Sequence, residues 1–354
     1  MSLIVVLFNT LIYIGMGKLF DSKGKRIDIV ESSAMKGGEG VVYQVRGNTS
    51  TVVKVYRKGK GNFKKLRAMV QSQPLDPMRD HGLTSIAWPT KIIYDESRDP
   101  SGFLMPSCSG EKAFSVIAPG IRKKRYPNIS HKNLIRIGYN LAASMAAIHD
   151  QKCFVSDVNE ENVLVDPDNY TVAWIDCDSY HIVSNKETFR CTVYRPSHTP
   201  PEHQGKTPET YDTTIYHDRF GLSVLLFQLL MEGVHPFEGS GPGKVHERIK
   251  TGDWPYDTKN GRHIPRQASP DIGILNYDLR KYFRQCFLNG YHSPSLRPSC
   301  RDWMNVLEKA ESKTQQCPHV SSHTYSDHLS SCPWCQREDM LRSGFSGGKT
   351  QSVP

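Results

Sequence analysis

A short polar segment near the middle of the chain limits most strongly what this sequence can fold into. The run VSDVNEEN places Asp157 five residues before Asn162, and Asp176 follows a second apolar, strand-like stretch. Phosphoryl transfer from Mg-ATP needs a carboxylate that orients the acceptor hydroxyl and oxygen ligands that bind Mg²⁺. Asp157 suits the first task, and Asn162 and Asp176 suit the second. A polar turn between two strands is the alternative, because Asp and Asn are also common turn residues.

A glycine-rich hairpin is predicted upstream of this segment. Residues 36–45 and 51–56 alternate β-branched with polar side chains, which predicts two strands joined by a turn at Gly47. Glycines let the backbone approach phosphates without a clash at Cβ, and Lys54 places an ammonium group on the second strand, 14 residues after Gly40. An ordinary tight turn is the alternative, but the lysine spacing favours a phosphate-binding loop. The glycines of this loop are Gly37, Gly38 and Gly40.

Further motifs follow in order along the chain. The segment Thr199–Glu202 (TPPE) precedes an apolar helix pattern that starts at Asp218 and closes at Gly233, and Leu296–Ser299 (LRPS) comes later. Together with the glycine loop, the lysine and the D-x4-N pair, this order resembles the signature motifs of eukaryotic-like (Hanks-type) protein kinases. The resemblance covers about residues 27–312. It implies an α+β, bilobal fold in which a small antiparallel sheet and a larger helical lobe enclose ATP.

The resemblance implies ATP and Mg²⁺ (or Mn²⁺) as cofactors and a residue for each part of their site. The three glycines would cover the phosphates, with Val42 over the adenine. Lys54 would hold the α- and β-phosphates, and Met105 would lie at the hinge between the lobes. Asn162 and Asp176 would ligate the metal.

The same resemblance implies the catalytic and supporting residues. Asp157 corresponds to the catalytic aspartate, and Asp218 corresponds to the helix aspartate that supports the catalytic loop. Glu202 and Arg297 correspond to the residues that form a buried ion pair in the C-terminal lobe. The activity implied is ATP-dependent phosphorylation of serine or threonine hydroxyls on a protein substrate.

The catalytic segment departs from the family pattern at three positions. Val155 and Ser156 replace the usual His and Arg, which indicates a non-RD kinase without the arginine that pairs with a phosphorylated activation loop. Asn159 stands where Ser/Thr kinases usually carry a lysine, so this position brings no positive charge to the transferring phosphoryl group. Either the rate is lower or another cation substitutes.

No glutamate follows Lys54 at the distance expected for its ion-pair partner. The helix predicted over residues 62–71 contains only basic and neutral side chains. An unpaired lysine is typical of inactive relatives, so a pseudokinase scaffold that binds nucleotide or partners without turnover is an alternative. The candidates to orient the lysine instead are Gln71, Gln73 and Asp76.

The predicted metal-binding motif also departs from the family pattern, because residues 176–178 are Asp-Cys-Asp. Asp178 adds a second carboxylate beside the predicted Mg²⁺ site and is expected to aid metal binding; a solvent-facing loop acid is the alternative. The form I-D-x-D also resembles aminoglycoside phosphotransferases and related small-molecule kinases. The presence of Glu202, Asp218 and Arg297 favours a protein substrate.

The C-terminal tail contains a second candidate site. Cys332 and Cys335 form a C-x2-C pair with the spacing of a zinc chelate, and Cys317 and His323 complete a Cys3His set. A closed tetrahedral set predicts structural Zn²⁺. A thioredoxin-like redox pair and a disordered tail with unrelated cysteines are the alternatives. The histidines that could replace His323 are His319 and His328.

The tail is expected to dock on the C-terminal lobe, because zinc binding alone returns less free energy than ordering a segment of this length costs. Its Cys-Pro-Trp-Cys ending resembles bacterial kinases with a zinc module after the catalytic domain, some of them encoded in stress and tellurite-resistance operons. That resemblance implies a protein substrate and a cognate phosphatase or another operon product as partners.

The composition indicates the cellular compartment and the kinds of partner that the chain can have. The nine cysteines show no pairing pattern, which favours a reducing cytoplasm over a disulfide framework. The net charge of +9 is expected to attract acidic proteins and phosphates, and nucleic-acid binding is the less favoured interpretation. The apolar run 3–14 is shorter than the ~20 residues of a membrane-spanning helix and lacks signal-peptide features, so no membrane association is expected and Met16 is a plausible start.

The sequence thus predicts five consecutive parts. They are an apolar extension and lead-in (1–26), a kinase N-lobe (27–105), a kinase C-lobe (106–312), a zinc-binding module (313–338) and a disordered tail (339–354).

Overall fold

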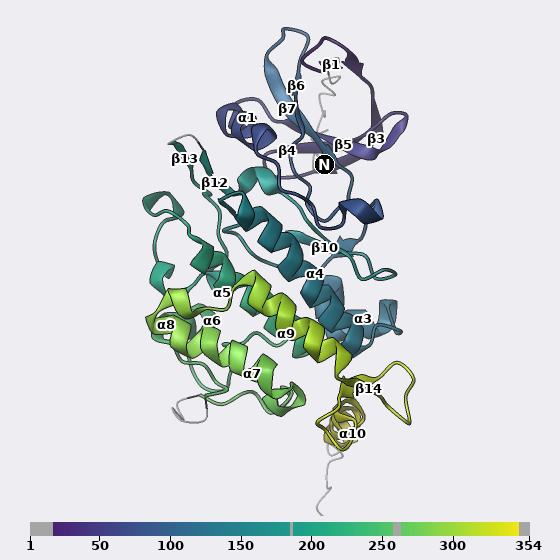
Figure 1. Cartoon of the computed structure of the whole chain (residues 1–354), viewed down its shortest axis with the longest axis vertical. Helices are drawn as coiled ribbons and strands as arrows, with labels where there is room; N and C mark the ends of the chain where they lie inside the picture. Colours follow the sequence, from purple (N-terminus) through teal and green to yellow (C-terminus); the bar gives the residue numbers. More distant parts are fainter. Residues whose placement is uncertain (1–16, 185–186, 258–262, 347–354) are drawn as a thin grey trace, which may run out of the picture.

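Strands gather in a small N-terminal lobe and helices in a larger C-terminal lobe (Figure 1). The structure, a computed structural model, describes residues 17–184, 187–257 and 263–346. This mixture of helices with a curled antiparallel sheet is compatible with the kinase-like α+β fold expected from the sequence. The apolar run 3–14 and Met16 lie outside the described residues.

A seven-stranded sheet in the order β2-β1-β6-β7-β5-β4-β3 builds the small lobe, and its strand pairs are antiparallel. Lys54 lies on the interior strand β5, opposite Val42 of β4 on one side and Phe103 of β7 on the other. A Cβ at Gly102 would lie 2.0 Å from the Lys54 carbonyl oxygen, so only glycine permits this strand contact. The strands are β1 (Leu19–Phe20), β2 (Arg26–Ile27), β3 (Ile29–Lys36), β4 (Gly40–Val45), β5 (Asn48–Tyr56), β6 (Lys91–Tyr94) and β7 (Pro100–Pro106).

Helix α1 (Phe63–Gln71) is the helix predicted over residues 62–71. Asn62 begins it, because its side chain accepts a hydrogen bond from the Lys65 amide at 3.0 Å. The buried face carries Leu66 and Met69 together with the unusual Lys65. This face contains no acid that could pair with Lys54.

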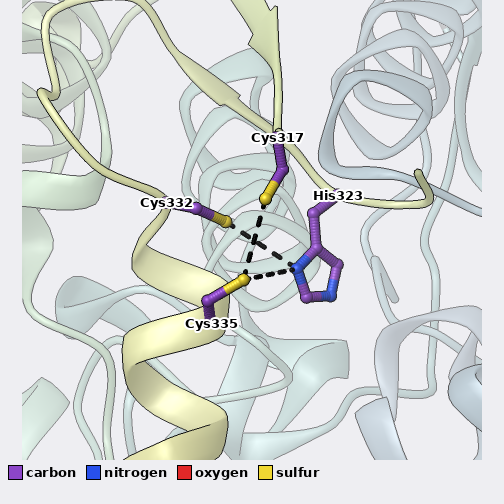
Figure 2. A group of neighbouring side chains, drawn as sticks. All are labelled: Cys317, His323, Cys332 and Cys335. Atoms are coloured by element: carbon purple, nitrogen blue, oxygen red, sulfur yellow. Dashed lines mark hydrogen bonds between the residues drawn. The ribbon is translucent and has the colours of Figure 1, made fainter. Parts of the chain in front are cut away.

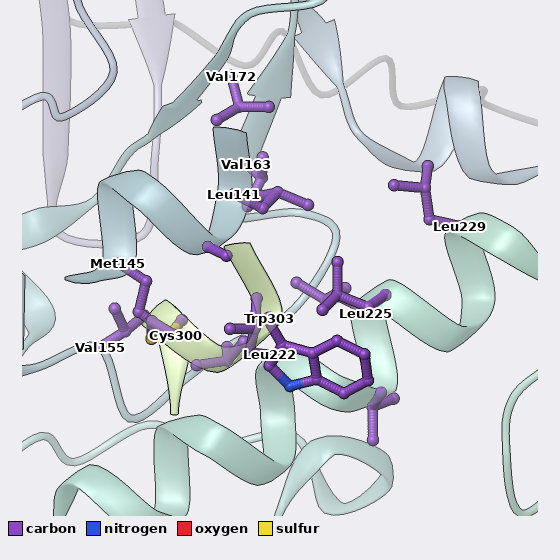
Figure 3. Packing of buried hydrophobic residues seen from close by; sticks show 14 of the residues in the cluster. Leu141, Met145, Val155, Val163, Val172, Leu222, Leu225, Leu229, Cys300 and Trp303 are labelled. Carbon is purple, nitrogen blue, oxygen red and sulfur yellow. The ribbon is translucent and has the colours of Figure 1, made fainter. Parts of the chain in front are cut away.

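Helix α4 (His131–Asp150) is the centre of the large lobe and packs against α5 (Ile215–Leu230) and α9 (Cys300–Ser312). Helix α5 is apolar on all sides and almost entirely buried, which is typical of a core helix. Trp303 of α9 lies among the buried leucines of α5 (Figure 3), and its Nε1 donates to Ser223 Oγ at 3.2 Å. The other helices of this lobe are α2 (Phe114–Ile117), α3 (Pro119–Arg125), α6 (Val245–Thr251), α7 (Tyr277–Arg284) and α8 (Gly290–His292).

Two small three-stranded sheets position the polar segments identified in the sequence. The segment 155–162 connects strands of the two sheets, and Asp176 follows the last strand of one of them. Both segments are therefore short loops with fixed ends. One sheet contains β8 (Glu111–Lys112), β10 (Val163–Val165) and β11 (Val172–Trp174), and the other contains β9 (Cys153–Phe154), β12 (His181–Ser184) and β13 (Glu187–Phe189).

The tail forms the strand pair β14 (Thr314–Gln316) and β15 (Thr324–Ser326), followed by α10 (Pro333–Ser346). The expected disordered tail from residue 339 is thus corrected, because α10 continues to Ser346; residues 347–354 lie outside the described part. Its first turns are anchored by the buried Trp334 and by an ion pair of Glu338 with Lys123. None of the helices among the described residues has both the length and the apolar character needed to cross a bilayer.

Candidate active site and zinc centre

The backbone before Asp157 is held by a buried carboxylate of α5. Asp218 accepts hydrogen bonds from the amides of Val155 (2.7 Å) and Ser156 (2.8 Å), and His149 Nε2 lies 2.9 Å from the same carboxylate. Ser156 has a φ of 65°, a left-handed conformation that costs a serine free energy. The Asp218 carboxylate therefore fixes a strained turn that presents Asp157.

Hydrogen bonds within the loop orient Asp157. Asn162 Nδ2 donates to both the carboxylate Oδ2 and the main-chain carbonyl of Asp157, each at 2.9 Å. Burial raises the pKa of Asp157, against the opposing effects of the Asn162 hydrogen bond and the Arg195 charge. Within the described part of the chain, Asp157 Oδ1 is buried and accepts no hydrogen bond.

The buried side chain of Asn159 forms hydrogen bonds with the backbone of this loop. Its side chain donates to the Asp157 carbonyl at 3.0 Å and accepts from the Glu161 amide at 2.9 Å, and the residue is 2% exposed. The Asn159 amide is therefore engaged by the backbone of its own loop.

Although no glutamate follows Lys54 at the usual distance in the sequence, the Asp178 carboxylate pairs with it. The Lys54 ammonium lies 2.8 and 2.7 Å from the two Asp178 oxygens and 2.8 Å from Asp176 Oδ1, and Tyr56 donates its hydroxyl to Asp178 at 2.6 Å. Burial lowers the pKa of Lys54, but the two carboxylates outweigh burial and raise it above its usual value. The lysine is consequently cationic and fixed in position.

These contacts bear on two sequence-based expectations. Gln71, Gln73 and Asp76 were the candidates to orient Lys54, but Asp76 instead accepts from the amides of Ser85 (2.8 Å) and Ile86 (3.1 Å). Both oxygens of Asp178 are bonded to Lys54 or Tyr56 and its side chain is 3% exposed, while its role as a metal ligand stays a prediction. Asp178 is thus a buried carboxylate partner of Lys54 that lies far from it in the sequence.

The remaining oxygen donors suit Mg²⁺. Asp176 is 47% exposed on its side chain, in contrast to Asp178. The Ile175 amide donates to the Asn162 carbonyl at 3.0 Å, which holds the two metal-binding candidates on adjacent segments. Asn162 uses Nδ2 for Asp157 and so keeps its Oδ1 as an acceptor. A carboxylate and an amide oxygen fit a hard divalent cation.

The glycine loop closes tightly at its base and is open at its tip. The Gly37 amide donates to the Gly40 carbonyl at 2.8 Å, and a Cβ at Gly40 would lie 2.4 Å from the Val55 carbonyl oxygen. No atom lies within 4 Å of a Cβ built at Gly38, so the tip has room for a ligand. Met105 lies one residue before the end of β7, where the chain leaves the sheet, and its role at the hinge stays a prediction.

The Glu202–Arg297 ion pair expected from the resemblance is present. Two parallel hydrogen bonds of 2.7 and 2.6 Å join the guanidinium to the carboxylate, and Arg297 also donates to the carbonyls of Tyr216 (2.9 Å) and Gly290 (3.1 Å). The Arg297 side chain is fully buried. A bidentate pair of this kind fixes the relative geometry of Glu202 and Arg297. An exposed surface ion pair would contribute little to stability.

A pH-dependent contribution to stability is expected from His149. Burial opposes its protonation, but Cys300 and Asp218 outweigh burial and raise the pKa of His149 to about 10 from 6.5. Because the folded pKa exceeds the unfolded one, the contribution is complete below pH 6.5 and is lost as the pH rises toward 10. The free energy of unfolding, measured by urea denaturation across this window, should fall more steeply for the native chain than for His149→Gln. Equal slopes would contradict the assignment.

The four predicted zinc ligands converge in the tail, and their side chains point toward one centre (Figure 2). The Sγ atoms of Cys317 and Cys335 are 3.7 Å apart, and His323 Nδ1 lies 3.7 and 3.6 Å from the sulfurs of Cys332 and Cys335. Tetrahedral Zn–S bonds of about 2.3 Å require sulfur separations of about 3.8 Å, so the site fits zinc. The four atoms lie within 4.8 Å of one another.

The structure also distinguishes among the histidines. His328 uses both ring nitrogens elsewhere, at 2.8 Å from Ser326 Oγ and 2.9 Å from the Gly273 carbonyl. His323 Nε2, on the side away from the cysteines, lies 3.8 Å from Glu338. A carboxylate behind a ligating histidine is the usual arrangement that orients the ring.

The Cys/His cluster of the tail is continuous with the large lobe. Trp334 packs its ring 4.9 Å from His131 of α4 and donates to the Thr324 carbonyl at 2.7 Å, and the Thr324 hydroxyl accepts from the Lys132 amide at 2.8 Å. Lys123 of α3 bonds Glu338 at 2.6 Å. The tail therefore packs on the C-terminal lobe, as its energetics predicted.

The chain is similar to curated bacterial proteins that are named as protein kinases. The chain is 30% identical over 310 residues to "Protein kinase YegI" of Escherichia coli O157:H7, which covers 85% of this chain and 47% of that protein. It is also 30% identical over 328 residues to the protein of the same name from Escherichia coli strain K12, with coverages of 90% and 50%. The chain thus spans about half the length of these curated relatives. No protein-family profile matches the chain.

Proposed function

We propose that this protein is an ATP- and Mg²⁺-dependent kinase that phosphorylates serine or threonine hydroxyls of a protein substrate. The observation that carries the proposal is the pairing of Lys54 with two carboxylates, Asp176 and Asp178, beside a catalytic loop whose Asp157 is oriented by Asn162. The kinase-named relatives support the same class of activity.

Each residue has a chemical task in this proposal. Asp157 orients the acceptor hydroxyl and receives its proton, while Lys54 binds the α- and β-phosphates. Asn162 and Asp176 would hold the divalent cation, which neutralises charge on the phosphates. The open tip of the glycine loop at Gly38 would cover the triphosphate.

The rival functions are less well supported. The pseudokinase alternative rests on a missing partner for Lys54, and the Lys54–Asp178 pair speaks against it. A small-molecule phosphotransferase would need no buried Glu202–Arg297 pair, and that pair is bidentate and buried at Arg297. We assign the zinc cluster a structural task, because three thiolates and an imidazole leave no open coordination position.

Replacement of Asp157 by alanine tests the proposal. Phosphate incorporation from γ-labelled ATP into the chain itself or a generic basic protein should be lost, because the hydroxyl no longer has an orienting base. Binding of a fluorescent ATP analogue should persist, since Asp157 does not hold the nucleotide. Asp168→Ala, at an exposed turn after β10, is the matched control and should retain activity. A native chain that binds nucleotide but transfers no phosphate to any protein would contradict the proposal.

A further inference from the structure

The catalytic loop supplies no positive charge. Between Val155 and Asn162 the ionisable side chains are Asp157, Glu160 and Glu161, and Asn159 is occupied by the backbone. A transferring phosphoryl group develops negative charge on its equatorial oxygens, and kinases and GTPases place a cation there. We propose that Arg195, from the segment before the TPPE motif, is this cation; the inference rests on the proposed kinase function.

Arg195 is held against the catalytic loop by an ion pair. Its Nη1 donates to Glu160 Oε1 at 2.5 Å, and Glu160 lies three residues after Asp157. The Glu160 side chain is only 14% exposed and also lies 3.4 Å from His198 Nε2. The Glu160 carboxylate therefore holds the Arg195 guanidinium in a fixed position.

The backbone at Arg195 is fixed as well. Its carbonyl accepts hydrogen bonds from the His198 amide at 2.9 Å and the Thr199 hydroxyl at 3.0 Å, and Pro196 follows directly. Both the Cα position and the guanidinium are thus set by contacts that need no phosphorylated loop. This arrangement suits a chain in which Ser156 replaces the family's loop-binding arginine.

The guanidinium remains within reach of a ligand. The Arg195 side chain is 35% exposed, and its bond to Glu160 uses Nη1, so Nη2 and Nε remain as N–H donors. Its charge acts on the Asp157 carboxylate, where it opposes the rise in pKa caused mainly by burial. Arg195 therefore combines a fixed position, partial exposure and electrostatic contact with the catalytic base.

The neighbouring lysines suit this task less well. Lys54 is bonded to Asp176 and Asp178 on the side of the site where the α- and β-phosphates are proposed to lie. Lys112 donates to the main-chain carbonyl of Glu161, and burial lowers its pKa. A planar guanidinium also matches phosphate oxygens better than a single ammonium group.

Phosphoryl transfer needs no reactant beyond ATP and the acceptor hydroxyl. The acceptor oxygen forms a bond to the γ-phosphorus while the bond from that phosphorus to the β–γ bridging oxygen breaks. The hydroxyl proton passes to Asp157, and ADP leaves with the bonding electron pair. Arg195 donates hydrogen bonds to the γ-phosphoryl oxygens during transfer and does not exchange a proton.

The test compares Arg195→Ala with Arg190→Ala, whose guanidinium pairs with Asp212 in the same segment and is exposed. For Arg195→Ala we expect kcat to fall by about 10²-fold while KM for ATP stays within about threefold, because the lost interaction forms only in the transition state. Added guanidinium should restore part of kcat, and Arg195→Lys should keep more activity than the alanine variant. Arg190→Ala should match the native chain.

Several outcomes would overturn the inference. An unchanged kcat in Arg195→Ala, with an active native chain, would exclude Arg195 alone and leave the kinase function intact. A loss that guanidinium does not rescue, accompanied by a lower melting temperature, would show a purely structural role. A larger kcat loss in Lys112→Ala would assign the charge to Lys112. A native chain without phosphate transfer would instead refute the proposed function, and this inference with it.

Discussion

Replacing Asp178 by asparagine is expected to lower kcat/KM for phosphate transfer by about 10²-fold, or about 2.7 kcal/mol of transition-state stabilisation. Asparagine keeps the shape of the side chain but removes the charge that holds the Lys54 ammonium. The lysine would then be held by the half-exposed Asp176 alone, and that carboxylate is also the proposed metal ligand. Lys54 should therefore be less well oriented, and Asp176 should be less available to bind the metal.

A Mg²⁺ titration separates this role from metal binding. If Asp178 anchors Lys54, the defect of Asp178→Asn should persist at saturating Mg²⁺. Recovery of the native rate at high Mg²⁺ would instead return Asp178 to the metal site, as the sequence first suggested. Tyr56→Phe, which removes one hydrogen bond to the same carboxylate, should show a smaller loss of the same kind. Asp168→Asn is the exposed control.

Replacing Cys332 by serine is expected to reduce zinc from one ion per chain to well below one and to unfold the tail. Structural zinc contributes about 10–16 kcal/mol in small modules, and three remaining ligands hold it far more weakly. Loss of the ion would release Trp334 from His131 and Glu338 from Lys123. Elemental analysis and limited trypsin digestion, with cleavage sites identified by mass spectrometry, measure the two effects.

The matched control is Cys108→Ser, because Cys108 lies outside the zinc cluster. It should retain zinc and resist cleavage in the tail as the native chain does. Native protein purified without a chelator and containing well under one zinc per chain would contradict the zinc assignment. Retention of zinc by Cys332→Ser would contradict the proposed ligand set.

The sequence predicted best those features that depend on local spacing. The β4–β5 hairpin, helix α1 and the hydrogen bond between Asn162 and Asp157 rest on contacts within a few residues. The Cys3His set was also predictable, since its C-x2-C pair has the spacing of a chelate. Turn residues, alternation and chelate spacing are properties of neighbouring positions, so they are visible without a fold.

The partner of Lys54 and the role of Arg195 were not visible in this way. Asp178 lies 124 positions from Lys54, whereas the sequence offers Gln71, Gln73 and Asp76 as the nearest polar candidates. The one available signal was the second carboxylate of the I-D-x-D motif, which was interpreted as a metal ligand. Arg195 and Glu160 lie 35 positions apart and share no motif.

The amino-acid sequence by itself determined the order of the motifs, the alternation that makes the hairpin and the set of residues able to transfer phosphate or bind zinc. Only the tertiary structure decided that the buried Lys54 pairs with Asp178 and that Arg195 pairs with Glu160. The physical reason is that a buried charge must find a partner wherever packing brings one within hydrogen-bonding distance. Packing joins segments whose separation along the chain follows no period, so the choice of partner appears only once the two lobes and the tail are folded together.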